Sequence, residues 1–299
     1  MNISVICAIV KNEQRFIREW AEHYLRIGFD RLYIYEDFGS ASHLKELKDL
    51  IEDGRVVLTP LATANVIPHY KKGTHVQRCL YDHFLWKCKK EKLADWAGFF
   101  DVDEFMMFED GWDLQRLENY FSDKGGVLLS WKVYGANGHI KRPKGNVVDN
   151  YTKHLPEGSL IGKGRIPEWN VKSLVNVQLV GNQRAIHVFD GCVFTDGKSF
   201  TDGNLVFCKA WLNHYYAKSW EDYCDRIFAR GNMHNNYRCL DLFFEVSPEF
   251  SKRKKEMIYA QRNRHCASTM WLSRELKLIS GGNVQRLEEL RKKKVQNAH

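Results

Sequence analysis

Three carboxylates stand close together in the chain, at Asp101, Asp103 and Glu104, directly after the apolar run of residues 96–100. An apolar run of this length is typical of a buried strand. Open α/β sheets bind their ligands at the carboxyl ends of the strands. Two carboxylates at such an end suit a divalent cation that takes its remaining ligands from water and substrate phosphates. The Asp-x-Asp pair therefore indicates a metal site, although a plain surface turn would use the same residues.

The composition is that of a globular protein with a real hydrophobic core. The 299 residues suffice for one large domain or two small ones. A hydrophobic content of 44% and a charged content of 27% are ordinary for soluble domains. The net charge of +8 favours an anionic partner, such as a nucleotide phosphate, a nucleic acid or an acidic membrane surface.

The cysteines and the N-terminus indicate an intracellular location. The eight cysteines form no Cys-x-x-Cys pair, and several lie in apolar runs, as reduced core cysteines do. The N-terminus lacks a basic leader region, and no apolar run is long enough to span a bilayer. We expect a cytoplasmic protein that is intact at its first residue. The basic segments 252–255 and 291–294 leave open a peripheral contact with the inner face of the membrane, although a solvated helix face explains them as well.

The elements that would position the carboxylates alternate between strand and helix. Apolar runs predict strands at 3–10, 31–35 and 56–59 and one ending at Asp101, and helical periodicity predicts helices at 12–28, 44–51 and 74–92. This alternation predicts a doubly wound parallel sheet with right-handed crossovers. Further along, we expect strands at 127–134 and 210–216, a helix at 219–230 and a helical remainder.

An ordered set of short motifs runs from the first strand to about residue 232. Its members are Val10-Lys11-Asn12-Glu13, Glu19-Trp20 with His23-Tyr24 and Gly28, Tyr33-Ile34-Tyr35-Glu36-Asp37 with Ser40, Asp101-Val102-Asp103-Glu104-Phe105, Gly135 with Gly138-His139, Lys172-Ser173 with Val175 and His187, and His214-Tyr215-Tyr216 with Lys218-Ser219 and Arg230-Gly231. Together they resemble the signature of glycosyltransferases of family 2 and the related family 92, which have the GT-A fold. Two departures stand out. Glu36-Asp37-Phe38-Gly39 replaces the more usual Asp-Asn pair, and the basic C-terminal helices lie outside the shared region.

This resemblance implies a GT-A-type α/β fold, with a doubly wound, mostly parallel central sheet flanked by helices and a basic helical C-terminal extension. We expect the GT-A domain over residues 1–250 and the extension over 251–299. Within the domain, residues 1–110 would form the nucleotide-binding half and residues 111–250 the acceptor half.

The resemblance also makes the Asp-x-Asp element the metal end of a nucleotide-sugar site. Asp103 is expected to bind the metal directly, and Asp101 either to bind it or to reach the ribose and metal-bound water. A late histidine can complete the metal site in similar enzymes, which implies His214 as the third ligand and His187 as the alternative. Carboxylate and imidazole together suit Mn²⁺, with Mg²⁺ as the alternative. A hydrogen-bonded core histidine would also explain His214, and Glu104 has no assigned role.

The nucleotide-sugar donor is expected to lie across the carboxyl ends of the first strands. The residues expected to bind it are Val10, Asn12, Glu13, Asp37, Gln77, Asp101, Gly138, His139, Lys172 and Lys218, with the two lysines and Arg230 as partners of the diphosphate. Several of these have simpler explanations: Asn12 would serve as a helix N-cap, and a tight turn would explain Gly135 and Gly138. Arg78 is more plainly a solvent-exposed helix residue.

Inversion at the anomeric carbon needs a general base within hydrogen-bond reach of the acceptor hydroxyl. Asp241 and Glu245, one helical turn apart, are the expected catalytic carboxylates. Asp196 and Asp202 are the alternatives, and the sequence does not choose among the four.

The resemblance and these residues together imply an inverting, metal-dependent hexosyltransferase. It would move a hexose from a UDP-sugar to a hydroxyl of a glycan acceptor such as lipopolysaccharide or capsule, and the resemblance to family 92 makes galactose the first expectation. A nucleotidyltransferase that makes activated sugars would need a glycine-rich phosphate loop, and residues 10–15 contain no glycine. A basic nucleic-acid- or membrane-binding protein without catalysis would need a continuous basic face with aromatic residues. We expect no nucleic-acid partner, and the oligomeric state is left open.

Overall fold

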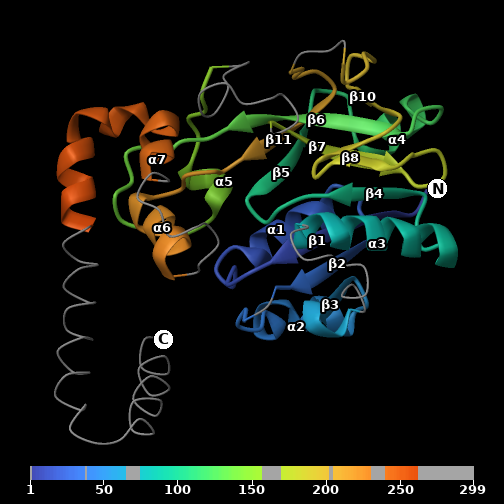
Figure 1. Ribbon diagram of the computed structural model, residues 1–299, viewed down its shortest axis with the longest axis horizontal. Coiled ribbons are helices and arrows are strands. Elements are labelled where there is room, and N and C mark those ends of the chain that lie inside the picture. The colour runs from blue at the N-terminus through green and yellow to red at the C-terminus, as the bar shows by residue number, and fades with distance from the viewer. Residues whose placement is uncertain are drawn as a thin grey trace, which may run out of the picture. The chain divides into compact units, whose positions relative to one another are not determined.

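The computed structural model describes residues 2–37, 39–64, 75–156, 170–201, 205–229 and 240–261. Two compact units divide the chain, Met1–Pro248 and Glu249–His299. The first unit carries the sheet and every residue of the site described below (Figure 1). Its division into a nucleotide-binding half and an acceptor half stays a prediction.

The first part of the chain forms the alternating strands and helices that the sequence predicts. The parallel neighbours β3, β2, β1 and β4 are joined through α1, α2 and α3. Their bounds are β1 Ser4–Val10, α1 Ile17–Arg26, β2 Arg31–Glu36, α2 Leu44–Glu52, β3 Val56–Pro60, η1 Leu61–Thr63, α3 Val76–Glu91 and β4 Trp96–Phe99. The expected βαβαβ order is therefore confirmed.

Helix α1 begins later than its hydrophobic pattern predicts. Asn12 adopts a left-handed backbone with φ of 54°, and its side-chain oxygen accepts a hydrogen bond from the backbone of Ala41 at 2.8 Å. Helix α1 starts at Ile17 with Phe16 as its N-cap residue, so Asn12 joins two loops and is not the N-cap. Gly28, at φ of 111°, lies just beyond the other end of α1, as expected for a glycine that ends a helix.

The second part of the chain adds strands in both directions. Among the described residues the main sheet follows the order β3-β2-β1-β4-β7-β6-β11-β5, and β10 pairs with the start of β6. Strand β7 is antiparallel to both β4 and β6, and β5 is antiparallel to β11. The bounds are β5 Glu104–Phe108, α4 Leu114–Tyr120, β6 Gly126–Val133, α5 Val147–Asn150, β7 Val171–Asn176, β8 Gln183–Ala185, β9 Val188–Phe189, β10 Cys192–Phe194 and β11 Ala210–His214.

The Asp-x-Asp residues join two strands that are far apart in the order of the sheet. Strands β7, β6 and β11 lie between β4 and β5, yet only residues 100–103 connect β4 to β5 along the chain. The backbone N–H of Tyr215, just after β11, donates to the carbonyl of Asp103 at 2.8 Å. The sheet therefore curls so that its last strand returns to β4 through the Asp-x-Asp turn.

Two hydrophobic cores cover the two faces of the sheet, as expected for a doubly wound fold. Ile6 and Ala8 of β1 pack in one core with residues of α1, α2 and α4. Val5 and Cys7 point to the opposite face and pack with residues of α3. This alternation along one strand is the period of two that places neighbouring side chains on opposite faces.

Short helices follow the last strand. Their bounds are α6 Trp220–Cys224, η4 Asp225–Ala229, α7 Leu240–Val246 and η6 Pro248–Arg253. Most of the expected basic extension, from residue 262 onward, lies outside the described residues. No helix in the described part of the chain combines the length and apolarity needed to cross a bilayer.

Candidate active site

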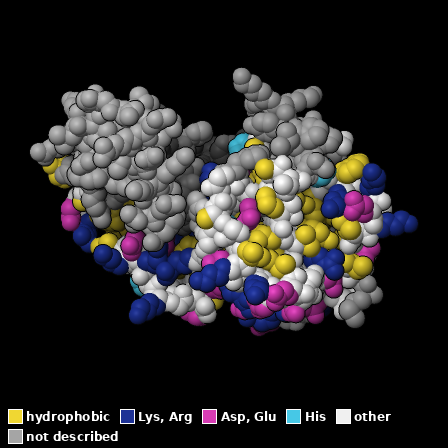
Figure 2. All heavy atoms as spheres, turned by 90° about the horizontal axis from the view of Figure 1, so that it is seen from below, with side chains coloured by type: hydrophobic (Ala, Val, Ile, Leu, Met, Phe, Trp, Pro, Cys, Tyr) yellow, Lys and Arg dark blue, Asp and Glu magenta, His cyan; other side chains and the backbone are white. Residues whose placement is uncertain are grey.

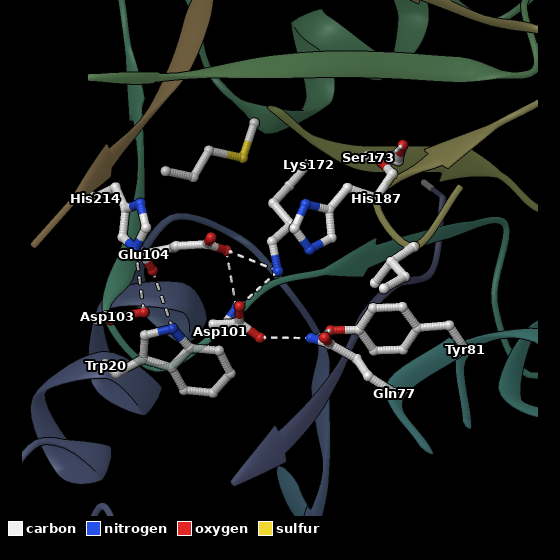
Figure 3. Close-up of polar contacts among 12 residues, drawn as sticks. Trp20, Gln77, Tyr81, Asp101, Asp103, Glu104, Lys172, Ser173, His187 and His214 are labelled. Carbon is white, nitrogen blue, oxygen red and sulfur yellow. Dashed lines mark hydrogen bonds and ion pairs between the residues drawn. The ribbon is translucent and has the colours of Figure 1, made fainter. Parts of the chain in front are cut away.

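Asp101 and Glu104 close a tight turn at the carboxyl end of β4. The backbone N–H of Glu104 donates to the carbonyl of Asp101 at 3.0 Å, and the N–H of Asp101 donates to Glu104 Oε2 at 2.9 Å. The Asp101 carboxylate bridges two further elements: it accepts from Gln77 of α3 at 2.9 Å and from Lys172 of β7 at 2.7 Å (Figure 3). Both oxygens of Asp101 thus have protein partners.

Lys172 lies fully buried between two of the three carboxylates. Its ammonium is 2.7 Å from Asp101 Oδ2 and 3.5 Å from Glu104 Oε2. Burial alone would lower the pKa of Lys172, but Asp101 and Glu104 outweigh it and the net shift is upward. Burial, together with Asp101 and Asp103, raises the pKa of Glu104 well above its usual range, and Lys172 opposes that shift. The expected diphosphate partner Lys172 is therefore the buried counter-ion of the turn.

Helix α1 holds the start of β5 in place. Trp20 Nε1 and the Tyr24 hydroxyl both donate to the backbone carbonyl of Glu104, at 3.0 and 2.9 Å. His23 Nε2 lies 2.8 Å from the carbonyl of Met106, two residues along β5. Three members of the expected motif, Trp20, His23 and Tyr24, thus act as a clamp on the segment that carries the carboxylates.

Asp103 faces an imidazole and a guanidinium. Its Oδ1 is 3.6 Å from His214 Nε2, and its Oδ2 is 3.3 Å from Arg226 Nη1. Burial would raise the pKa of Asp103, but His214, Lys218 and Arg226 outweigh it and hold the pKa well below its usual range. Asp103 is therefore a carboxylate in a strongly positive environment.

Arg226 is a site residue that the sequence analysis did not identify. It lies on η4, and its guanidinium lies over the rings of Tyr216 and Tyr223, at 4.5 and 4.9 Å from their centroids. The available signal was its place one helical turn before Arg230, which was the expected phosphate partner. Arg230 itself lies outside the described residues.

The expected lysine Lys218 lies close to Asp103 and is almost fully buried. Its backbone is left-handed, with φ of 52°, and its ammonium lies 4.5 Å from the centre of the Phe16 ring. Lys218 also contributes to the low pKa of Asp103. The structure thus places two cationic side chains, Lys218 and Arg226, around one carboxylate.

The side chains at Asp103 have the chemistry of a partial metal site. Among the described residues, no three His, Cys, Asp or Glu side chains are grouped to hold a metal ion. Asp103 and His214 do face each other, and carboxylate and imidazole are donors that Mg²⁺ or Mn²⁺ accepts. This donor set fits a cation that is held by few side chains and completed by substrate phosphates. Direct binding by Asp101, whose oxygens already have partners, stays a prediction.

Packing sets the orientation of His214. Its ring lies 4.4 Å from that of Trp131, and its buried Nδ1 has no hydrogen-bond partner within the described part of the chain. The alternative ligand His187 also contacts Trp131, at 5.6 Å between ring centroids. In Figure 3 it is the His214 ring, not the His187 ring, that points at Asp103. The geometry thus favours His214 over His187.

Among the residues expected to bind the base and the ribose, Val10 ends β1, whereas Asn12, Glu13 and Asp37 lie in the loops after β1 and β2. The carbonyl of Val10 accepts from the backbone of Asp37 at 2.8 Å, and the Asp37 carboxylate lies 3.6 Å from the ammonium of Lys11. The backbone N–H of Glu13 donates to His43 Nε2 at 2.9 Å. These contacts join the loops to each other at the carboxyl edge of the sheet.

The glycine motif after β6 forms a tight turn against the end of α7. A Cβ on Gly135 would lie 2.3 Å from the carbonyl oxygen of Val246, whereas one on Gly138 would meet open space. Gly138 has φ of 80°, and the His139 ring packs against Tyr151, with centroids 5.5 Å apart. The roles of Gly138 and His139 in donor binding stay predictions.

The candidate bases are spread over several elements. Asp241 is half-buried and Glu245 exposed on α7, which packs through Phe243 and Phe244 against Trp220 of α6. Asp196 lies 3.2 Å from Lys198 in the segment after β10, and Asp202 lies outside the described residues.

Arg78, expected to be solvent-exposed, donates to the carbonyl of Gln183 at 3.0 Å.

One face of the molecule has charges of both signs in close mixture. Figure 2 shows Lys and Arg side chains interspersed with Asp and Glu, with hydrophobic side chains between them. Over the described residues on this face, no continuous basic surface is present. This face gives no support to the nucleic-acid-binding alternative.

Comparison with known proteins identifies the family. Residues 4–265 match the model of glycosyltransferase family 92, and the chain belongs to this family. A family 92 protein of Oryza sativa subsp. japonica (Os08g0121900) is 26% identical over 228 residues, which cover 75% of this chain and 35% of the relative. One of Ricinus communis (RCOM_0530710) is 26% identical over 234 residues, covering 75% and 37%. The chain thus spans about a third of the length of the curated relatives it matches.

Solved structures resemble the chain more distantly. Glucosyl-3-phosphoglycerate synthase from Mycobacterium tuberculosis, in complex with Mn²⁺, UDP and phosphoglyceric acid, is 15% identical, with a TM-score of 0.28 over 44% of this chain and 43% of that one. HddC from Yersinia pseudotuberculosis is 13% identical, with a TM-score of 0.28 over 59% and 74%.

Proposed function

We propose that this protein is a metal-dependent glycosyltransferase that moves a hexose from a UDP-sugar to a hydroxyl of a glycan, with inversion at the anomeric carbon. The observation that carries the proposal is the pair Asp103 and His214, facing each other at 3.6 Å beside Arg226 and Lys218. The carboxylate and the imidazole can bind a divalent cation, and the cationic groups beside them can bind the oxygens of a diphosphate. Membership of family 92 supports the reaction class.

Different residues of the site have different proposed roles. Asp103 and His214 would hold Mn²⁺, or Mg²⁺ in its place, and the bound cation would stabilise negative charge on the departing diphosphate. Lys172 and Gln77 hold the Asp101 carboxylate through hydrogen bonds, and its proposed partner in the complex is the ribose or a metal-bound water. The loops of Val10, Asn12, Glu13 and Asp37 would contact the base and ribose.

Helix α7 carries the proposed catalytic carboxylates of the acceptor side. Asp241 or Glu245 of α7 would act as the general base on the acceptor hydroxyl. Galactose is the proposed donor sugar because the resemblance to family 92 implies it, and the proposed acceptor is a growing surface glycan such as lipopolysaccharide or capsule. We place the reaction in the cytoplasm, with the basic C-terminal segment available for peripheral contact with the inner membrane face.

Thermal unfolding with panels of nucleotide sugars tests the donor and the metal together. We expect UDP-sugars to raise the melting temperature in the presence of Mn²⁺, with smaller effects after chelation by EDTA and with GDP-sugars. Transfer from UDP-galactose to candidate glycans, followed by NMR of the new anomeric proton, then tests sugar and stereochemistry. No response to any UDP-sugar with Mn²⁺ would contradict the proposal. Formation of a UDP-sugar from UTP and a sugar phosphate would favour the nucleotidyltransferase instead.

A further inference from the structure

Arg226 has a buried guanidinium with unused hydrogen-bonding capacity. Its side chain is 14% exposed, and Nη1 faces Asp103 Oδ2 at 3.3 Å. The buried Nε and Nη2 atoms have no hydrogen-bond partner among the described residues. Leaving buried donors unpaired costs free energy, so an arginine in this state is prepared for a further acceptor.

The chemistry of that acceptor follows from the guanidinium and from its neighbours. A guanidinium presents a planar fork of donors that matches carboxylate and phosphate oxygens in pairs. The guanidinium lies over the rings of Tyr216 and Tyr223, and its buried Nε and Nη2 have no hydrogen-bond partner among the described residues. A phosphate beside Asp103 would satisfy both donors that now lack partners.

Arg226 also competes with a cation for Asp103. One oxygen of Asp103 faces His214, and the other faces Arg226. A divalent ion at Asp103 and a guanidinium on the same carboxylate repel each other, and this repulsion is strong where water is excluded. A diphosphate brings negative charge that removes the conflict, because both cationic groups can then contact its oxygens.

We propose that Arg226 exchanges partners during donor binding: it pairs with Asp103 in the nucleotide-free protein and moves to the diphosphate when metal and nucleotide bind. This role rests on the proposed function, because it requires a nucleoside diphosphate and a divalent cation at this site. Arg226 therefore weakens the binding of the metal alone and strengthens the binding of the metal–nucleotide complex. Metal and nucleotide binding are therefore coupled through one side chain, and the coupling is reciprocal.

The exchange predicts effects of opposite sign in a single variant. Arg226→Ala frees Asp103, so the nucleotide-free protein binds Mn²⁺ more tightly. The same variant binds UDP in the presence of Mn²⁺ roughly tenfold more weakly, as expected for one lost charge-assisted contact. Binding of uridine, which has no phosphate, is unchanged. Arg226→Lys keeps the positive charge but not the planar pair of donors. We therefore expect its Mn²⁺ affinity to match that of the wild type, and its UDP affinity to lie between those of Arg226→Ala and the wild type.

The test measures Mn²⁺ binding by water-proton relaxation and nucleotide binding by calorimetry, on the full chain. Arg55→Ala is the control: Arg55 forms an exposed ion pair with Asp53 before β3, at the opposite edge of the sheet. Circular dichroism establishes that each variant is folded. A partly unfolded variant would lose both affinities, so a gain for Mn²⁺ together with a loss for UDP supports the exchange.

Two results would overturn the proposal in distinguishable ways. If wild-type protein binds no UDP with Mn²⁺, the proposed function fails and this role fails with it. If the wild type binds UDP but Arg226→Ala leaves Mn²⁺ affinity unchanged or lowers it, the exchange is wrong while the proposed function stands.

Discussion

Trp20 in α1 donates its indole N–H to the backbone carbonyl of Glu104 at 3.0 Å, across 84 positions of sequence. Tyr24, one helical turn later, donates to the same carbonyl oxygen. In the sequence, Trp20 and Tyr24 stand out only as part of the family resemblance, whereas the structure gives both a specific role. It fixes the strand that continues directly from Asp103.

Removing the Tyr24 hydroxyl should therefore weaken the clamp. Tyr24→Phe deletes one donor to Glu104 and the acceptor of the Met106 N–H, which lies 3.2 Å away. We expect a loss of about 1–3 kcal/mol in the free energy of unfolding, measured with urea. Tyr120→Phe, on a side chain that is 60% exposed, should change it by less than about 0.5 kcal/mol. Equal effects in the two variants would contradict the clamp.

Asp103→Asn tests the proposed metal site with a substitution of the same shape. The amide cannot replace the anionic charge that faces His214 and Arg226. We expect sugar transfer to fall by at least about 100-fold, since electrostatic stabilisation is usually the largest catalytic contribution. Metal-dependent UDP binding should be lost, while the circular dichroism spectrum stays unchanged. Retained transfer would exclude Asp103 as a ligand. The exposed Asp49→Asn is the matched control.

A double-mutant cycle tests the ion pair of Lys172 and Asp101. Lys172→Met leaves the Asp101 carboxylate without the buried ammonium that lies 2.7 Å from it, and we expect a cost of about 1–3 kcal/mol in the free energy of unfolding. In the Asp101→Asn background the penalty should be smaller by about 0.5–3 kcal/mol, because a neutral amide needs no counter-ion. Additive effects in urea unfolding would mean that the two side chains do not interact. Removal of the exposed pair at Arg55 should cost under about 1 kcal/mol.

His23 should make the protein less stable in weak acid. Burial lowers the pKa of His23 to about 4; its contact with the Met106 carbonyl opposes this shift and Arg26 adds to it. In the unfolded chain the pKa is about 6.5. Between these values the unfolded chain binds a proton that the folded protein does not, so stability falls as the pH falls from 6.5 to 4. The full loss is about 3 kcal/mol. His23→Gln should flatten this part of the stability curve relative to wild type, and an unchanged slope would contradict the assignment.

The two glycines after β6 should respond differently to alanine. Gly135→Ala drives a Cβ to 2.3 Å from the carbonyl of Val246, where backbone has to move, and we expect a cost of about 2–3 kcal/mol. Gly138→Ala meets open space and has only its left-handed φ of 80° to disfavour it, at about 1 kcal/mol. Melting temperatures of the two variants provide the comparison. The reverse order would mean that the turn does not pack against α7 as described.

The first four strands and the helices between them could be predicted because each has a local signal. Apolar runs mark β1 and β4, and Gly28 marks the end of α1. Strand β5 has no such mark, because it begins at the charged Glu104, whose burial depends on Lys172 from β7. A strand is present before the Asp-x-Asp residues as predicted, but β4 ends at Phe99 rather than at Asp101.

Within the site, the sequence could supply residue types but not their partners. Lys172 was expected at a phosphate, and only the antiparallel placement of β7 beside β4 shows that it lies against Asp101. For Arg226 the one local signal is its spacing of four residues from Arg230, and this spacing does not show that its partner is Asp103. Pairings of this kind depend on strand order, which local patterns of polarity do not encode.

The return of β5 to β4 through residues 100–103 gives the Asp-x-Asp segment a second task. It is the covalent link that completes a ring of strands running through β7, β6 and β11. Insertion or deletion of a single residue there would displace β5 along β11 and turn its side chains to the wrong face. We therefore expect the length of this segment to tolerate less variation than its side chains, since an altered side chain affects the chemistry while an altered length affects the whole sheet.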